Sequence, residues 1–125
     1  MATGLDNLKI YQMAVDLEMK VHKVTKSFPT DELYRSVDQL RRSSSSVANN
    51  IAESYNRRSV KDRCHILRDF AISEAEETES NILRCGSKKF LDTRLAKDIA
   101  NGYIDLKRAT YGYIRFLNKT NRLDN

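Results

Sequence analysis

Apolar residues recur along this chain at steps of three and four positions, in four successive segments separated by polar and charged residues. This is the spacing of one face of an α-helix. The pattern therefore predicts four amphipathic helices. Their expected bounds are about residues 8–27, 30–56, 59–86 and 92–119.

Each predicted helix has a face that is expected to point into a shared core. These inner positions are, in chain order, Ile10, Ala14, Leu17, Val21, Val24 and Phe28; Leu33, Val37, Leu40, Ser44, Val47 and Ile51; Val60, Cys64, Leu67, Ala71, Ala75 and Ile82; and Leu95, Ile99, Gly102, Leu106, Ala109, Tyr113 and Leu117. Pro29 ends the first helix, because the residue before a proline is disfavoured in helical geometry. Thr30, Ser59 and Asp92 are expected to be N-caps, and Gly86 is expected to end the third helix.

The second and third segments have apolar patterns that stay in phase across a short turn near Arg57. If the two helices are antiparallel, Val47 lies opposite Leu67 and Val37 lies opposite Thr78. Short connections and in-phase stripes are typical of an up-down-up-down bundle. The sequence predicts an all-α fold, an antiparallel four-helix bundle that forms one domain over residues 1–125.

Composition agrees with a helical domain and adds a moderate positive charge. The 125 residues include four Gly and one Pro, so few positions break helices, and the net charge is +5. A basic protein of this kind suits a nucleic acid or an acidic protein as a partner. Cys64 and Cys85 have neither metal-ligand spacing nor the number expected of a disulfide framework. No apolar run could span a bilayer, and the first residues do not resemble a signal peptide, so a cytoplasmic location is expected.

One family resemblance rests on residues in a particular order. They are Leu8 to Ala14, Leu17, Thr25 to Pro29, Glu32 to Tyr34, Gln39 to Ser43, Ser46 to Glu53, Arg57 to Ser59, Leu67-Arg68 and Ser73 to Glu76. In these residues the chain resembles the bacterial four-helix-bundle family first noted in intervening sequences of large-subunit ribosomal RNA genes. That family is distantly related to the accessory variability determinant of diversity-generating retroelements.

The resemblance implies a four-helix bundle that assembles into a ring-like homo-oligomer, with a pentamer as the expected number of subunits. It does not imply an enzyme. Through the retroelement relative, it implies RNA, DNA, a ribonucleoprotein or a reverse-transcriptase-like protein as partner. The chain departs from the family pattern at Asn49 and Ser54 of the second helix. It also departs at Glu74 and Glu77, where apolar residues are usual, so the outer face of the third helix is expected to pack differently here.

The turn between the second and third helices is the strongest candidate site. Arg57, Arg58 and Lys61 surround the start of a helix, where free N–H groups and guanidinium groups can bind phosphate. Arg68 lies two turns beyond Lys61, which extends the candidate nucleic-acid-binding surface along the helix. The alternative is a solvated turn whose charges serve solubility.

Arg41 and Arg42 are secondary candidates with a competing structural role. The antiparallel register places them opposite Ser73, Glu74 and Glu76. Ion pairs between the helices are therefore the favoured interpretation, and nucleic-acid contact is the alternative. Exposed pairs of this kind would add about 0.2–1 kcal/mol each and would mainly select the correct helix pairing.

Small polar residues form a second face beside the apolar stripe of the second helix. They are Ser43, Ser46, Asn50, Glu53 and Ser54. Small side chains allow close helix approach, and their hydroxyls can bond to carbonyls one turn earlier. A packed or interfacial role is favoured over a plain solvent face, which would be richer in Lys and Glu.

Tyr103 and Tyr111 lie two turns apart near basic residues. They could stack on bases, pack in the bundle with the hydroxyl at the rim, or cover a subunit interface together with Phe116. Catalysis is not supported, because His22 and His65 have no neighbouring ligands and no Gly-rich phosphate loop occurs. No enzyme activity, metal or cofactor is expected. Two hypotheses remain: a nucleic-acid-binding oligomer, and a protein-interaction ring without nucleic-acid binding.

Overall fold

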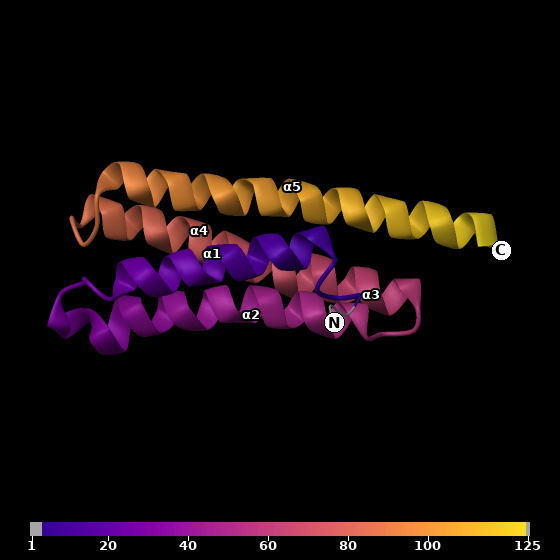
Figure 1. Ribbon diagram of the computed structural model, residues 1–125, viewed down its shortest axis with the longest axis horizontal. Coiled ribbons are helices and arrows are strands. Elements are labelled where there is room, and N and C mark those ends of the chain that lie inside the picture. Colours follow the sequence, from indigo (N-terminus) through magenta and orange to yellow (C-terminus); the bar gives the residue numbers. More distant parts are fainter. Residues whose placement is uncertain (1–3, 125) are drawn as a thin grey trace.

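The computed structural model describes residues 4–124, and the side chains of residues 4–122. Four long helical segments lie side by side (Figure 1). They are α1 (Lys9–Thr25); η1 (Thr30–Glu32), η2 (Leu33–Val37) and α2 (Asp38–Tyr55); α3 (Val60–Ile66), η3 (Leu67–Ala71) and α4 (Ile72–Ser87); and α5 (Thr93–Asp124). This confirms the predicted all-α four-helix bundle.

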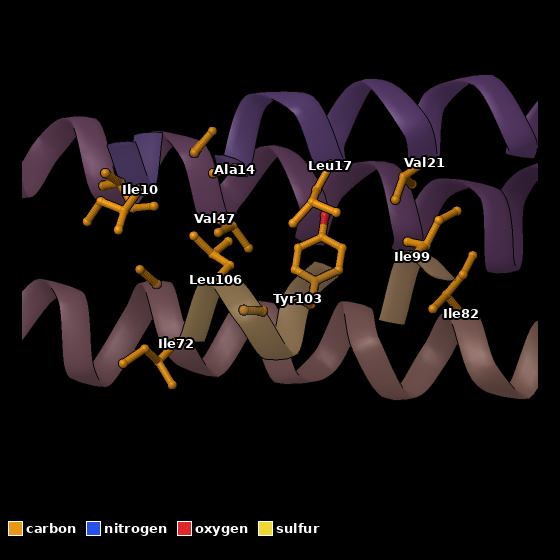
Figure 2. Packing of buried hydrophobic residues seen from close by; sticks show 14 of the residues in the cluster. Ile10, Ala14, Leu17, Val21, Val47, Ile72, Ile82, Ile99, Tyr103 and Leu106 are labelled. Atoms are coloured by element: carbon orange, nitrogen blue, oxygen red, sulfur yellow. The ribbon is translucent and has the colours of Figure 1, made fainter. Parts of the chain in front are cut away.

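The segments pack in sequence order around the bundle. α1 contacts α2, α2 contacts α3 and α4, α4 contacts α5, and α5 closes the circle on α1. Aliphatic side chains from all four segments meet in the middle, with Val21, Leu40, Ile51, Ile82 and Leu106 almost completely buried (Figure 2). Burial of each such side chain contributes about 1.5–3 kcal/mol, so the shared core holds the helices together.

Two of the predicted inner positions are wrong. Leu33 is 46% exposed and Leu95 is 41% exposed. Leu33 begins the π-helical turn η2, where more residues are used per turn and the heptad spacing no longer applies. In α5, Ile99, Leu106 and Leu117 are buried as predicted, but part of the inner face is shifted by one residue, so Ala96 is buried in place of Leu95.

The same shift places Tyr103 in the core. Its side chain is completely buried, and Figure 2 shows the ring pointing toward Leu17 of α1. Neither base stacking nor coverage of a subunit interface is therefore open to Tyr103. Tyr111, in contrast, is 43% exposed, and Phe116 is 58% exposed.

The pairing of the second and third segments differs in register from the prediction. Thr78 Oγ1 donates a hydrogen bond of 2.7 Å to Ser43 Oγ, although Val37 was expected opposite Thr78. Two effects move the contact of Thr78 from Val37 toward the C-terminal end of α2. The π-helical turn η3 adds a residue to the third segment without a matching rise, and side chains lean toward the N-terminus of their own helix.

Of the three predicted N-caps, two are confirmed. Ser59 Oγ accepts the backbone N–H of Asp62 at 3.0 Å, and Asp92 Oδ1 accepts the N–H of Arg94 at 2.7 Å. Thr30 makes no such cap, because it lies within the short η1 turn. There Glu32 accepts the backbone N–H and the hydroxyl of Ser36. These hydrogen bonds hold the pKa of Glu32 below its usual range.

The connection from α4 to α5 ends differently from the prediction. Gly86 stays helical, and Lys89 takes the left-handed conformation with φ 68°. The N–H of Phe90 bonds to the carbonyl of Cys85, and the N–H of Lys89 bonds to that of Gly86, both at 3.0 Å. This is a Schellman motif, with lysine where glycine is usual. Phe90 then packs on Phe28 with ring centroids 5.7 Å apart, which covers this end of the core.

Candidate nucleic-acid interface

The α2–α3 turn lies at the end of the bundle that also carries the C-terminal end of α5 (Figure 1). The side chain of Arg57 is engaged within the molecule, since its Nη2 lies 2.6 Å from Glu53 Oε1 one turn earlier. Its carbonyl accepts a 2.7 Å hydrogen bond from Arg63 Nε, which fixes the path of the turn. Glu53 therefore neutralises part of the charge that the sequence assigned to phosphate binding.

Arg58 and Lys61 are exposed, and neither forms an ion pair within the described part of the chain. The N-cap of Ser59 leaves them beside the first turn of α3. Two unpaired cations at a helix start give the turn a positive potential toward solvent. The structure thus brings together Arg57, Arg58 and Lys61, with Arg57 partly neutralised.

Arg68 lies further along the same segment, in the π-helical turn η3, and is exposed. The neighbouring His65 Nδ1 contacts Asp69 Oδ2 at 2.6 Å, so this carboxylate is directed to the histidine. Burial raises the pKa of the Cys64 thiol, and the charge of Arg68 partly opposes that rise. Because Cys64 Sγ also lies 3.9 Å from Asn118 Oδ1, Arg68 belongs to the side of the segment that faces α5.

The expected ion pairs of Arg41 and Arg42 with the third segment are not formed. Arg41 Nε donates to Thr25 Oγ1 at 3.0 Å, so its side chain crosses to α1. Arg42 is 78% exposed and lies 3.7 Å from Asp38 of its own helix. Its charge lowers the pKa of Glu74, although burial and the adjacent carboxylate of Glu77 raise it by more. Arg41 is thus a structural residue here, and Arg42 stays available to solvent.

Of the two carboxylates that were expected to face these arginines, Glu76 lies near a lysine of α5 instead, together with Glu79. Lys107 Nζ lies 2.7 Å from Glu79 Oε1 and 3.9 Å from Glu76 Oε1. The lysine side chain is only 20% exposed, so this contact is screened less than a fully exposed pair. Lys107 therefore joins α5 to α4 and is not free for a partner.

The small polar face of α2 divides into two parts. Ser43 and Ser54 are buried, and Ser54 Oγ donates to the carbonyl of Ile51 at 2.7 Å. Ser46 and Asn50 are half-buried and bond to one another, with Asn50 Nδ2 3.0 Å from Ser46 Oγ. Ser43 and Ser54 are thus packed inside the bundle, while Asn50 and Glu53 face the surface.

Two shallow grooves run along this surface between α2 and the third segment. One of about 430 Å³ is lined by Asn50, Glu53, Arg57, Asp62, His65, Ile66 and Phe70. The other, of about 640 Å³, is lined by Gln39, Arg41, Arg42, Ser43, Ser45, Ser46, Asn49, Glu74 and Glu77. Both carry carboxylates as well as cations, so neither is a purely basic channel.

A further group of cations lies on α5 and was not among the site residues predicted from the sequence. Arg115, Lys119 and Arg122 line, with Asn118, a hollow of about 510 Å³ near the C-terminal end of the helix. The signal was present in the sequence as a spacing of four and three residues in a stretch without acidic residues. We call Arg115, Lys119 and Arg122 the α5 cation stripe.

The sequence model of the family described as 23S rRNA-intervening sequence protein matches residues 6–112. The chain belongs to this family. The resemblance to this family noted from the sequence is therefore confirmed.

A solved relative supports the fold. It is a crystal structure of a protein of unknown function from the S23 ribosomal protein family of Bacteroides thetaiotaomicron, with a TM-score of 0.75 and 20% sequence identity. The match covers 84% of this chain and 97% of that one. No curated protein sequence gives a significant match to the chain.

Within residues 4–124 of this family member, no group of three or more His, Cys, Asp or Glu side chains is placed to hold a metal ion. Over the same residues, no helix has the length and hydrophobicity required to cross a membrane. The surface features that stand out in the described structure are its exposed cations, at the α2–α3 turn and on α5.

Proposed function

We propose that this protein is a non-enzymatic, homo-oligomeric helical bundle of the cytoplasm that binds RNA, free or in a ribonucleoprotein, through phosphate contacts. The observation that carries the proposal is the group of exposed cations without ion-pair partners at one end of the bundle, in a family described by ribosomal RNA. Arg58, Lys61 and Arg68 are the main candidates. Arg57 contributes when it leaves Glu53, and Arg42 is a secondary contact.

The chemistry of these residues favours binding by charge and shape. Arginine forms two parallel hydrogen bonds with a phosphate, and lysine adds a compact positive charge. Helical surfaces of this kind do not enter the deep and narrow major groove of an RNA duplex, so the bases there are not read. Affinity should then depend on contacts with the RNA backbone and fall as the salt concentration rises. The logarithm of the binding constant should fall with the logarithm of the salt concentration, with a slope of about 0.7–0.9 per phosphate neutralised.

The test is fluorescence anisotropy of a labelled, structured RNA, titrated with the protein over a series of salt concentrations. Arg58→Glu/Lys61→Glu is expected to weaken binding and to lower the salt slope by about two. The matched control is Arg94→Glu/Lys97→Glu, which makes the same change in charge on exposed residues at the first turns of α5, the opposite end of the bundle (Figure 1). Equal losses in both variants would mean that net charge alone decides, and unchanged affinity in the first would remove these residues from the proposal.

A second candidate function is a protein-interaction ring that does not bind nucleic acid. The observation that favours it is the set of large apolar side chains left at the surface, among them Phe70 beside the 430 Å³ groove and Phe116 on α5. Sedimentation analysis of the purified chain gives its oligomeric state. A stable oligomer that shows no RNA affinity even at low salt would favour this function over the first.

A further inference from the structure

The C-terminal part of α5 differs in charge from the rest of the molecule. From Leu106 through Leu123 the chain has no Asp or Glu, although acidic residues occur throughout the preceding helices. The helix continues to Asp124, and its end projects beyond the α2–α3 turn (Figure 1). Side chains on this projecting part have little protein around them, so a partner can reach them.

The three residues of the α5 cation stripe share one face of the helix. At 100° and 1.5 Å per residue, Arg115, Lys119 and Arg122 deviate by no more than about 40° from one line, and they extend over about 10 Å. All three are exposed, and none forms an ion pair within the described part of the chain. Arg122 Nε donates a hydrogen bond of 3.4 Å to the backbone carbonyl of Asn118, which leaves its charge without a carboxylate partner in the described part of the chain.

Several other cations of the molecule lie close to a carboxylate, whereas the cations of the stripe do not. Lys107 is held by Glu79 at 2.7 Å, and Arg57 is held by Glu53 at 2.6 Å. Arg108 lies 4.0 Å from Asp105 of its own helix. The α5 cation stripe therefore presents three full charges in a row, whereas the α2–α3 turn presents cations mixed with carboxylates.

An exposed aromatic ring borders the stripe. Phe116 is 58% exposed, and its ring is stacked on that of Tyr113 at 6.2 Å with an interplanar angle of 26°. On the helix, Phe116 lies on the side of Lys119 away from Asn118, and Asn118 faces Cys64 of α3. The stripe is thus flanked by the α3–α5 contact on one side and by an open aromatic face on the other.

We propose that the α5 cation stripe, together with Phe116, binds an unpaired RNA segment adjoining the structured part that contacts the α2–α3 turn. This inference rests on the proposed function. A line of cations that follows a backbone, beside an aromatic ring on which a base can stack, is the combination by which proteins hold single-stranded nucleic acid. A duplex offers phosphates but no free base face, so Phe116 would gain nothing from it.

The experiment compares two labelled RNAs that share one hairpin, one blunt and one with an unpaired tail. Wild type is expected to bind the tailed RNA more tightly. Arg115→Gln/Lys119→Gln/Arg122→Gln is expected to lose this preference and to lower the salt slope on the tailed RNA by about two. Phe116→Ala is expected to weaken binding of the tailed RNA by about 5- to 150-fold with little effect on the blunt one. Far-UV circular dichroism checks that the variants keep their helices.

The outcomes separate this inference from the proposed function. If both RNAs bind equally well and only Arg58→Glu/Lys61→Glu weakens them, the inference is wrong and the proposed function stands. If neither RNA binds wild type at low salt, both are wrong. If the stripe variant weakens both RNAs equally while Phe116→Ala changes neither, the stripe binds duplex backbone and the unpaired segment is excluded.

Discussion

Tyr103 buries a hydroxyl group that has no hydrogen-bond partner among the residues that the structure describes. The side chain is completely buried between α5 and α1, and its oxygen is unsatisfied. Burial, with a smaller contribution from the charge of Glu18, raises the pKa of Tyr103 well above the usual range of a tyrosine. The aromatic ring of Tyr103 fills the core, but the unsatisfied hydroxyl oxygen lowers the free energy of unfolding.

The size of that cost follows from desolvation. A buried polar group left unsatisfied costs about 1–3 kcal/mol. Tyr103→Phe removes the oxygen and keeps the ring, at the expense of a gap smaller than a methyl group. We therefore expect the variant to be more stable than wild type by about 1 kcal/mol, which corresponds to about 3–5 °C in Tm for a chain of this length. Tyr103→Ala should instead lose about 3–5 kcal/mol, because it empties the site.

The assay is urea denaturation at a series of pH values, followed by circular dichroism. Because burial raises the pKa of Tyr103 in the folded state, titration of this group does not affect stability below the unfolded pKa of about 10. Above that pH the tyrosine ionises in the unfolded chain but not in the folded protein, so the free energy of unfolding falls. Wild type should thus lose up to about 1.4 kcal/mol per pH unit above pH 10 relative to Tyr103→Phe. Tyr111→Phe, at an exposed tyrosine of the same helix, is the control and should change nothing.

Two results would contradict this prediction. If Tyr103→Phe were less stable than wild type by 1 kcal/mol or more, the hydroxyl would have a hydrogen-bond partner in solution. An unchanged difference between the two proteins above pH 10 would show that the phenol is not sealed from solvent. Either result would refute the reasoning from the orphaned oxygen.

Three further predictions concern the remaining packing. Lys89→Gly should stabilise the protein by about 1 kcal/mol in urea denaturation, since glycine adopts φ 68° without strain; a loss would mean that the lysine side chain contributes to the turn. Thr78→Val should cost about 1–2 kcal/mol in the same assay by leaving Ser43 Oγ without the 2.7 Å partner, and adding Ser43→Ala should recover part of the loss; strict additivity would contradict the coupling. Gly102→Ala should lower Tm by a few degrees, because an added Cβ would lie closer to Leu17 Cδ2 than the sum of the two van der Waals radii, and a higher Tm would show that the leucine moves freely.

The bundle and its helix ends were predictable because they depend on local spacing. The steps of three and four residues identify the four segments, and Ser59 and Asp92 cap their helices as predicted. The two π-helical turns were not visible, since one extra residue changes the apolar spacing too little to be recognised. The turn η2 accounts for the exposure of Leu33, and the turn η3 contributes to the shifted contact of Thr78.

The candidate site was predictable only in part, because the direction of a long side chain depends on its three-dimensional neighbours. Arg41 lies in the helix that was predicted, yet it reaches Thr25 of α1 because a hydroxyl is available there. Arg57 was predicted as a site residue because of its charge. Its ion pair with Glu53 was not predicted, although the two residues are four positions apart, the spacing at which side chains meet on one face of a helix. The α5 cation stripe needed only a search for stretches without acidic residues.

The π-helical turn η3 has a geometric consequence. It lies between α3, which carries Lys61, and α4, which carries the buried contact of Thr78 with Ser43. A π-helical turn contains more residues than an α-helical turn, so it rotates the faces of α3 relative to those of α4. Within α3, Cys64 and Ile66 remain buried, while Lys61 points to solvent. The direction of the exposed cation at this end of the molecule is therefore set by one turn of the third segment.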